Sequence, residues 1–110
     1  MANKHRGEVS VHLAGKDLVL CFGINQIVDL EDRLGVDVNG IEVMLRNPSM
    51  KTIRAVLWAG LRKHHNLSID EVGDLITPAE IPLAMSKAGE AIALAFPDGE
   101  GQSSNPQKGA

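Results

Sequence analysis

Several kinds of residue are scarce in this sequence, and each scarcity weighs against a class of protein. A single cysteine among 110 residues excludes an internal disulfide framework and a metal site built from several thiolates. Aromatic residues make up 3% of the chain, so few side chains can stack on nucleic-acid bases. The 11 basic and 14 acidic residues give a net charge of −3, which argues mildly against a nucleic-acid binder.

Long hydrophobic stretches are also missing. No apolar run reaches the roughly 20 residues of a membrane-spanning helix, and the N-terminus lacks the pattern of a secretory signal. Hydrophobic residues still make up 44% of the chain, enough for one core. The composition predicts a globular, mainly helical protein of the cytoplasm. We expect a flexible N-terminus (residues 1–6), one domain (residues 7–96) and a disordered tail (residues 97–110) that has no large apolar side chain.

Two short segments near the N-terminus alternate apolar and polar residues, which is typical of strands. The intervening residues 14–17 include a glycine that can adopt a positive φ, and they predict a turn. The second segment is apolar on both faces, so we expect part of it to be covered on both sides. The alternating residues are Val9, Val11 and Leu13 in the first segment and Leu18, Leu20 and Phe22 in the second. The pattern predicts a β-hairpin.

From Gly23 onward the apolar residues recur at helical spacing, and the sequence predicts an α+β domain in which the hairpin precedes a bundle of four to five short helices. The second helix is expected over about residues 39–45, and the last begins at Thr77 or Pro82. In the first helix the apolar positions are Ile24, Ile27, Val28, Leu30 and Leu34. The start and stop signals are Asn25 and Gly35 for the first helix, Asn47-Pro48 for the end of the second, Ser49 for the third, Ser68 with Glu71 for the fourth, and Pro97 for the end of the last.

The third helix is the most apolar, and we expect it to be central. A helix that is apolar over most of its circumference is usually buried. Its apolar positions are Met50, Ile53, Leu57, Gly60 and Leu61 on one face, widened by Val56, Trp58 and Ala59. We therefore expect Trp58 to lie in the core.

No catalytic or metal-binding pattern is present, so the sequence predicts a protein that is not an enzyme, with no catalytic residues, no cofactor and no metal. The adjacent His64 and His65 would point about 100° apart on a helix, so we expect solvated residues at a helix end. His12 is expected to be exposed on a strand. Cys21 has no local base or orienting group and is expected to be a small buried residue. The acidic residues 29–37 lack the spacing of a calcium loop.

Basic residues in or beside the third helix keep a small DNA-binding regulator open as an alternative. They are Arg46, Lys51, Arg54, Arg62 and Lys63. A helix-turn-helix protein would place such side chains on phosphates. The apolar residues around Trp58 favour a buried helix over one that enters a DNA groove.

Three segments, in this order and spacing, resemble a known family. They are Gly7-Glu8-Val9, Leu30-Glu31-Asp32 with Leu34-Gly35, and Leu57-Trp58-Ala59-Gly60-Leu61-Arg62. Over roughly residues 3–96 the chain resembles the small tail proteins of gene transfer agents and related siphophages, which are encoded between the major tail protein and the tape measure protein. The resemblance implies a tail assembly chaperone, in the cytoplasm of the bacterial host, that coats the helical tape measure protein before tube subunits polymerise around it. The family offers no catalytic residues to carry over.

The alternative within the same family is a structural tail component that stays in the particle. The major tail tube protein and further copies of this chain are additional partner hypotheses, whereas nucleic acid and membrane are not expected. A coat for a helical partner needs an exposed apolar groove or helix face. The last helix is the expected presenter, with the alternative that its apolar face only closes the bundle. The expected contact residues are Ile81, Met85, Ala88, Ile92 and Phe96.

Overall fold

The computed structural model describes residues 6–96 of the chain. The predicted flexible N-terminus lies outside this part except for Arg6, and the predicted disordered tail, residues 97–110, lies wholly outside it. The predicted domain, residues 7–96, falls within the described part.

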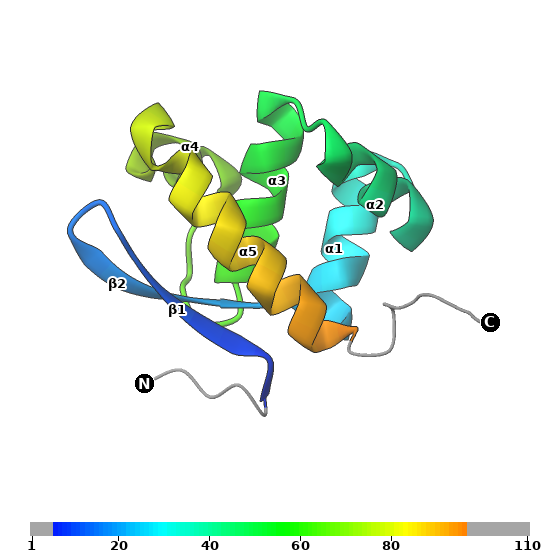
Figure 1. Ribbon diagram of the computed structural model, residues 1–110, viewed down its shortest axis with the longest axis horizontal. Helices are drawn as coiled ribbons and strands as arrows, with labels where there is room; N and C mark the ends of the chain where they lie inside the picture. Colours follow the sequence, from blue (N-terminus) through cyan, green and yellow to red (C-terminus); the bar gives the residue numbers. More distant parts are fainter. Residues whose placement is uncertain (1–5, 97–110) are drawn as a thin grey trace.

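The described chain begins with the predicted β-hairpin (Figure 1). β1 (Glu8–Leu13) and β2 (Lys16–Cys21) pair antiparallel. Ala14 and Gly15 connect them with φ angles of +53° and +74°, which is the left-handed conformation that a two-residue type I′ turn requires. The turn is shorter than predicted because residues 16 and 17 already pair within β2.

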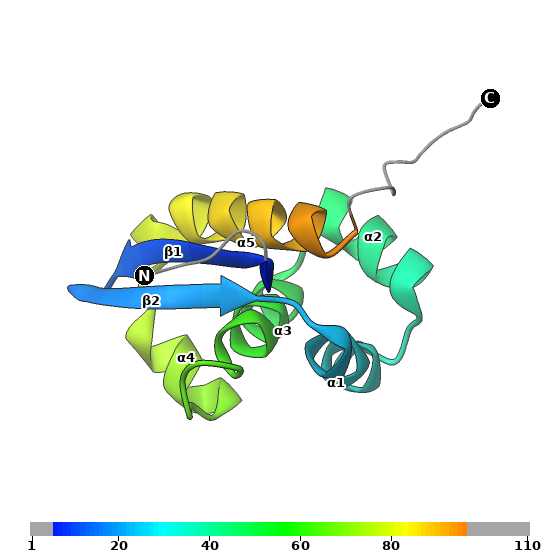
Figure 2. The ribbon, with the colours of Figure 1, turned by 90° about the horizontal axis from the view of Figure 1, so that it is seen from below.

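Helices follow the hairpin, and the predicted α+β class is confirmed. They are α1 (Ile24–Leu34), α2 (Val38–Arg46), α3 (Met50–Leu61), α4 (Ile69–Leu75) and α5 (Ile81–Ala95), with a 3-10 turn at Pro78–Glu80. Figures 1 and 2 show α1 and α2 at the end of the molecule opposite the hairpin turn. α5 lies along the hairpin and packs against both strands.

α3 is the central helix, as predicted. It packs against β2, α1, α4 and α5, and most of its residues are buried. A Cβ atom on Gly60 would lie 2.7 Å from the Phe22 ring and 2.9 Å from the side chain of Leu20. Because real Cβ contacts are not that short, α3 can approach the hairpin this closely only with glycine at this position.

Four residues predicted on apolar helix faces lie at or near the surface instead. Trp58 is only half-buried and packs against the edge of the core, so its prediction as a core residue is wrong. Met50 is 65% exposed, Ile24 is 83% exposed and Val28 is 45% exposed. Met50 and Ile24 are the first residues of their helices, and helical periodicity alone cannot show where the surface of the neighbouring element ends.

Two of the predicted helix starts are confirmed and one is wrong. The side chains of Ser49 and Ser68 each accept a hydrogen bond from the backbone N–H three residues further on. Asn25, however, is not the N-cap of α1. That position is Gly23, whose backbone N–H donates to Oε1 of Gln26 at 3.0 Å.

Glu80 joins the start of α5 to the hairpin turn. Its Oε2 accepts a hydrogen bond from the N–H of Ala14 at 2.7 Å, and its Oε1 accepts one from the N–H of Thr77 at 3.1 Å. These bonds hold the pKa of the Glu80 carboxyl below its usual value. Both predicted signals for the last helix are therefore in use, since Thr77 precedes the 3-10 turn and Pro82 lies in the first turn of α5.

The contact at Gly60 gives a first prediction. Gly60→Ala should lower the free energy of unfolding by about 1–3 kcal/mol, because the added methyl group overpacks the boundary with Phe22. Gly89→Ala is the matched control in α5, where an added Cβ meets nothing within 4 Å. It should stabilise the protein by about 0.5–1 kcal/mol through helix propensity. Urea unfolding of both variants tests this, and equal shifts in midpoint would contradict it.

Candidate functional site

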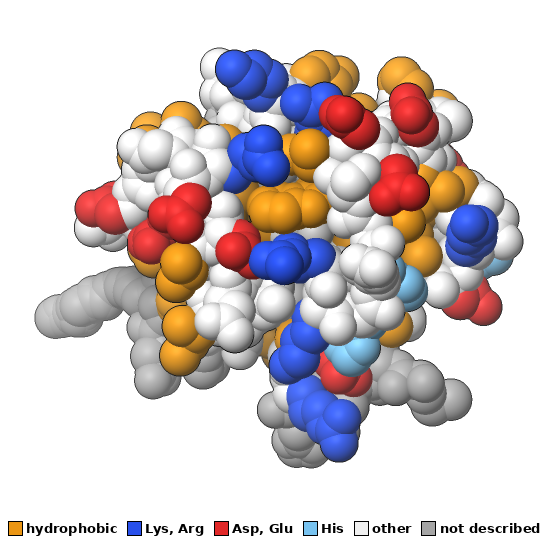
Figure 3. Space-filling model, turned by 180° about the vertical axis from the view of Figure 1, so that it is seen from behind, with side chains coloured by type: hydrophobic (Ala, Val, Ile, Leu, Met, Phe, Trp, Pro, Cys, Tyr) orange, Lys and Arg blue, Asp and Glu red, His pale blue; other side chains and the backbone are white. Residues whose placement is uncertain are grey.

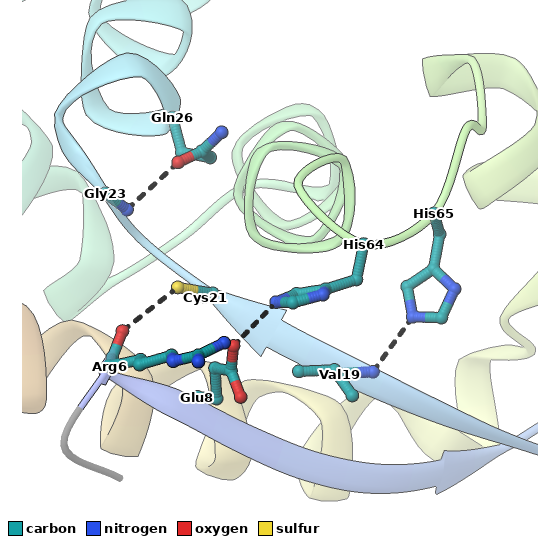
Figure 4. A network of polar contacts seen from close by, with 8 residues as sticks. All are labelled: Arg6, Glu8, Val19, Cys21, Gly23, Gln26, His64 and His65. Atoms are coloured by element: carbon teal, nitrogen blue, oxygen red, sulfur yellow. Dashed lines mark hydrogen bonds and ion pairs between the residues drawn. The ribbon is translucent and has the colours of Figure 1, made fainter. Parts of the chain in front are cut away.

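A network of polar contacts ties the hairpin to the turn that follows α3 (Figure 4). Glu8 of β1 is 5% exposed, and its carboxylate pairs with Nε2 of His64 at 3.1 Å. The backbone N–H of Val19 in β2 donates to Nε2 of His65 at 3.0 Å. The thiol of Cys21 donates to the carbonyl oxygen of Arg6 at 3.4 Å. The two histidines therefore contact opposite strands of the same hairpin.

The prediction that both histidines are solvated at a helix end is wrong for His65. α3 ends at Leu61, and the turn after it directs the His65 side chain to β2. His64 remains more exposed but also faces the hairpin. The bond to His65 joins residues 46 positions apart, and no local sequence signal predicts it. His12, by contrast, is exposed as predicted, and it pairs with Asp17 at 2.8 Å.

The bond to Val19 fixes the protonation state of His65. Nε2 can accept a hydrogen bond only in the neutral imidazole, with the proton on Nδ1. Burial lowers the pKa of His65, and the neighbouring His64 lowers it further. Burial likewise raises the pKa of the Cys21 thiol, which is 2% exposed. The thiol therefore stays protonated, and Cys21 is the buried residue that the sequence predicts.

A pH-dependent stability follows from His65. Below its ordinary pKa of about 6.5 the unfolded chain binds more protons at this histidine than the folded chain does. The contribution of His65 to stability is therefore complete at neutral pH and declines as the pH falls through 6.5. His65→Gln keeps a side-chain acceptor for Val19 but does not titrate. As the pH is lowered from about 7.5 to about 5, we expect the unfolding midpoint of the wild type to fall relative to that of His65→Gln. Parallel pH curves would contradict this.

The polar atoms of this network are committed to contacts within the fold. Across residues 6–96, no three His, Cys, Asp or Glu side chains are grouped so that they could hold a metal ion. The His65 acceptor is occupied by the backbone, and the thiol is held protonated. The His65 contact satisfies the backbone N–H of Val19 at the edge of β2. A strand edge with an unpaired N–H can pair with another chain.

The candidate binding site is an open apolar groove, separate from the histidine contacts. It has a volume of about 500 Å³ and lies between α1, α2 and the C-terminal half of α5. Its rim includes Val38 and Phe96, which are 40% and 39% exposed. The one charged side chain among its described lining residues is Glu42. The lining residues are Ile27, Leu30, Val38, Asn39, Ile41, Glu42, Leu45, Gly89, Ile92, Ala93 and Phe96.

The five residues expected to contact a partner do not form one continuous surface in the structure. Ile92 and Phe96 line this groove. Ala88 is fully buried and Met85 is half-buried against the core, so the middle of this helix face closes the bundle. Ile81 lies in a second groove, of about 490 Å³, between α3, α4 and the start of α5. The C-terminal end of the expected face therefore lies at a groove, whereas its middle packs within the bundle.

Comparison of the chain with protein-family models, curated proteins and solved structures finds no match. In the part of the chain that the structure describes, no helix is both long enough and apolar enough to cross a membrane.

Proposed function

We propose that this protein is a non-enzymatic tail assembly chaperone that binds the tape measure protein through the groove between α1, α2 and α5. The observation that carries the proposal is the groove itself, with its apolar lining and two exposed large side chains at the rim. The sequence resemblance to tail proteins of gene transfer agents and siphophages supplies the partner and the location, the cytoplasm of a bacterial host.

The shape of the groove favours a helical occupant. Amphipathic helices bind apolar grooves through side chains three and four residues apart. Gly89 and Ala93 lie one helical turn apart on the α5 side, and a Cβ on Gly89 would meet nothing within 4 Å. A partner helix can therefore approach α5 closely at this point. Glu42 on the α2 side favours a partner with a basic residue beside its apolar stripe.

The chain beyond the groove does not supply such an occupant. Residues 97–110 contain no large apolar side chain that could serve as an anchor. A separate protein with long apolar helical stripes fits better, and a tape measure protein is of this kind. Binding such stripes before tube assembly would keep them from aggregating, which requires no chemical reaction.

Filling the groove tests the proposal. Gly89→Leu directs a large side chain from the groove lining at a position where an added Cβ meets nothing within 4 Å. Ser86→Leu adds the same side chain at an exposed position of α5 outside the groove lining. On co-expression with the tape measure protein, wild type and Ser86→Leu should keep that partner soluble and co-purify with it. Gly89→Leu should recover about tenfold less, the loss expected from blocking the centre of an interface.

Two results would overturn the proposal. One is a tape measure protein that is equally soluble without this chain and never co-purifies with it. The other is a Gly89→Leu variant that binds as wild type does. Ile92→Asp is a less selective variant, because Ile92 also packs against the core and its loss would disturb the fold.

The presence or absence of this chain in finished particles distinguishes a structural tail component from a chaperone. A chaperone leaves before the tube closes, so purified particles should contain no more of this chain than an unrelated host protein of similar abundance. Quantitative mass spectrometry of particles measures this. A fixed number of copies per particle would favour the structural component and contradict the chaperone.

A further inference from the structure

The ring of Trp58, on the outward side of α3, carries two guanidinium groups. The Cζ atoms of Arg33 in α1 and Arg62 lie 5.1 Å and 5.4 Å from the ring centroid. Both distances are within the range of a cation–π contact, about 6 Å. The ring of the half-buried Trp58 therefore orients two cations at the surface.

Further cations continue this feature along α3. Lys51, Arg54, Trp58 and Arg62 follow one another at intervals of three or four residues, which places them on one face of the helix. Lys51, Arg54 and Arg62 are exposed, and so is Arg33 beside them. Figure 3 shows basic side chains running down this side of the molecule with a hydrophobic surface among them. We call these five residues, Arg33, Lys51, Arg54, Trp58 and Arg62, the Trp58 surface.

The positive charge of the Trp58 surface is only partly balanced. Arg62 pairs with Asp29, and Arg54 pairs with Asp70 at 3.6 Å. Among residues 6–96, no carboxylate lies within ion-pair distance of Arg33 or Lys51. The surface therefore carries net positive charge on a chain whose overall charge is −3.

We propose that the Trp58 surface binds an acidic helical segment of a partner protein. A guanidinium stacked on an aromatic ring keeps its N–H groups free in its own plane, where a carboxylate can accept two of them. The row from Lys51 to Arg62 is roughly 16 Å long, at 1.5 Å per residue. A helix with carboxylates three and four residues apart would match the cations in register.

Nucleic acid fits the same surface less well. The guanidinium groups lie over the Trp58 ring, so a base cannot stack there without displacing them. No residue of the Trp58 surface lines the groove between α1, α2 and α5, so this inference does not rest on the proposed function.

Trp58 itself reports binding, because it is the single tryptophan of the chain. The probe is a synthetic alanine-based helical peptide of about 16 residues, with glutamates three and four positions apart. We expect a saturable change in Trp58 emission that weakens as salt is added. The matched peptide with glutamine in place of each glutamate should produce none.

Two variants localise the effect. Arg33→Gln removes one of the two cations that lack a carboxylate partner among the described residues, and it should weaken peptide binding about tenfold. Lys87→Gln removes a cation on α5 that pairs with Glu90 at 3.2 Å, and it should leave binding unchanged. Circular dichroism establishes that both variants keep the fold.

Three outcomes of the peptide experiments would overturn the proposal. They are no saturable change with the acidic peptide, equal binding of the glutamine peptide, and equal loss in both variants. A double-stranded DNA oligomer that binds more tightly than the peptide and is weakened by Arg33→Gln would also overturn it, in favour of phosphate recognition.

Discussion

The close approach of α3 to β2 at Gly60 is the contact on which the rest of the molecule depends. It brings the most apolar helix against the apolar face of the hairpin, at the Phe22 ring. With that side of α3 fixed, its flanks meet α1, α4 and α5. The turn after α3 then returns to the hairpin with His64 and His65, and the remaining side of α3 is left to carry Trp58 at the surface.

Features that depend on neighbouring residues could be predicted from the sequence, and features that join distant segments could not. The serine caps and the left-handed Gly35 form hydrogen bonds only with residues up to four positions away, so the local sequence predicts them. The bond from Val19 to His65 spans 46 positions, and no local pattern announces it. The sequence could have indicated that Trp58 lies at the surface, because Arg54 and Arg62 lie one helical turn away on either side of it.

Only two of the eleven residues that line the candidate binding site could be predicted as binding residues. Ile92 and Phe96 were expected on a binding face, but the helical pattern could not separate them from the buried Ala88, because α5 is apolar nearly all round. The facing wall comes from α1 and α2, and its position depends on how the chain turns between them. Gly35, with φ +71°, and the Asp37 side chain, which accepts from Gly40, set that turn. These residues are recognisable as caps, whereas the angle between the two helices is a property of the packed core.

The bond between Glu80 and Ala14 has a consequence for how the protein is made. The hairpin leaves the ribosome before α5, which packs against both of its strands. A two-stranded hairpin is at best marginally stable in water without a partner. α3 can cover part of β2 earlier, but the residues of both strands that pack against α5 stay uncovered until α5 has been synthesised. Folding of this domain is completed only after translation has passed α5, and any factor that shields nascent apolar segments would act on the hairpin during that interval.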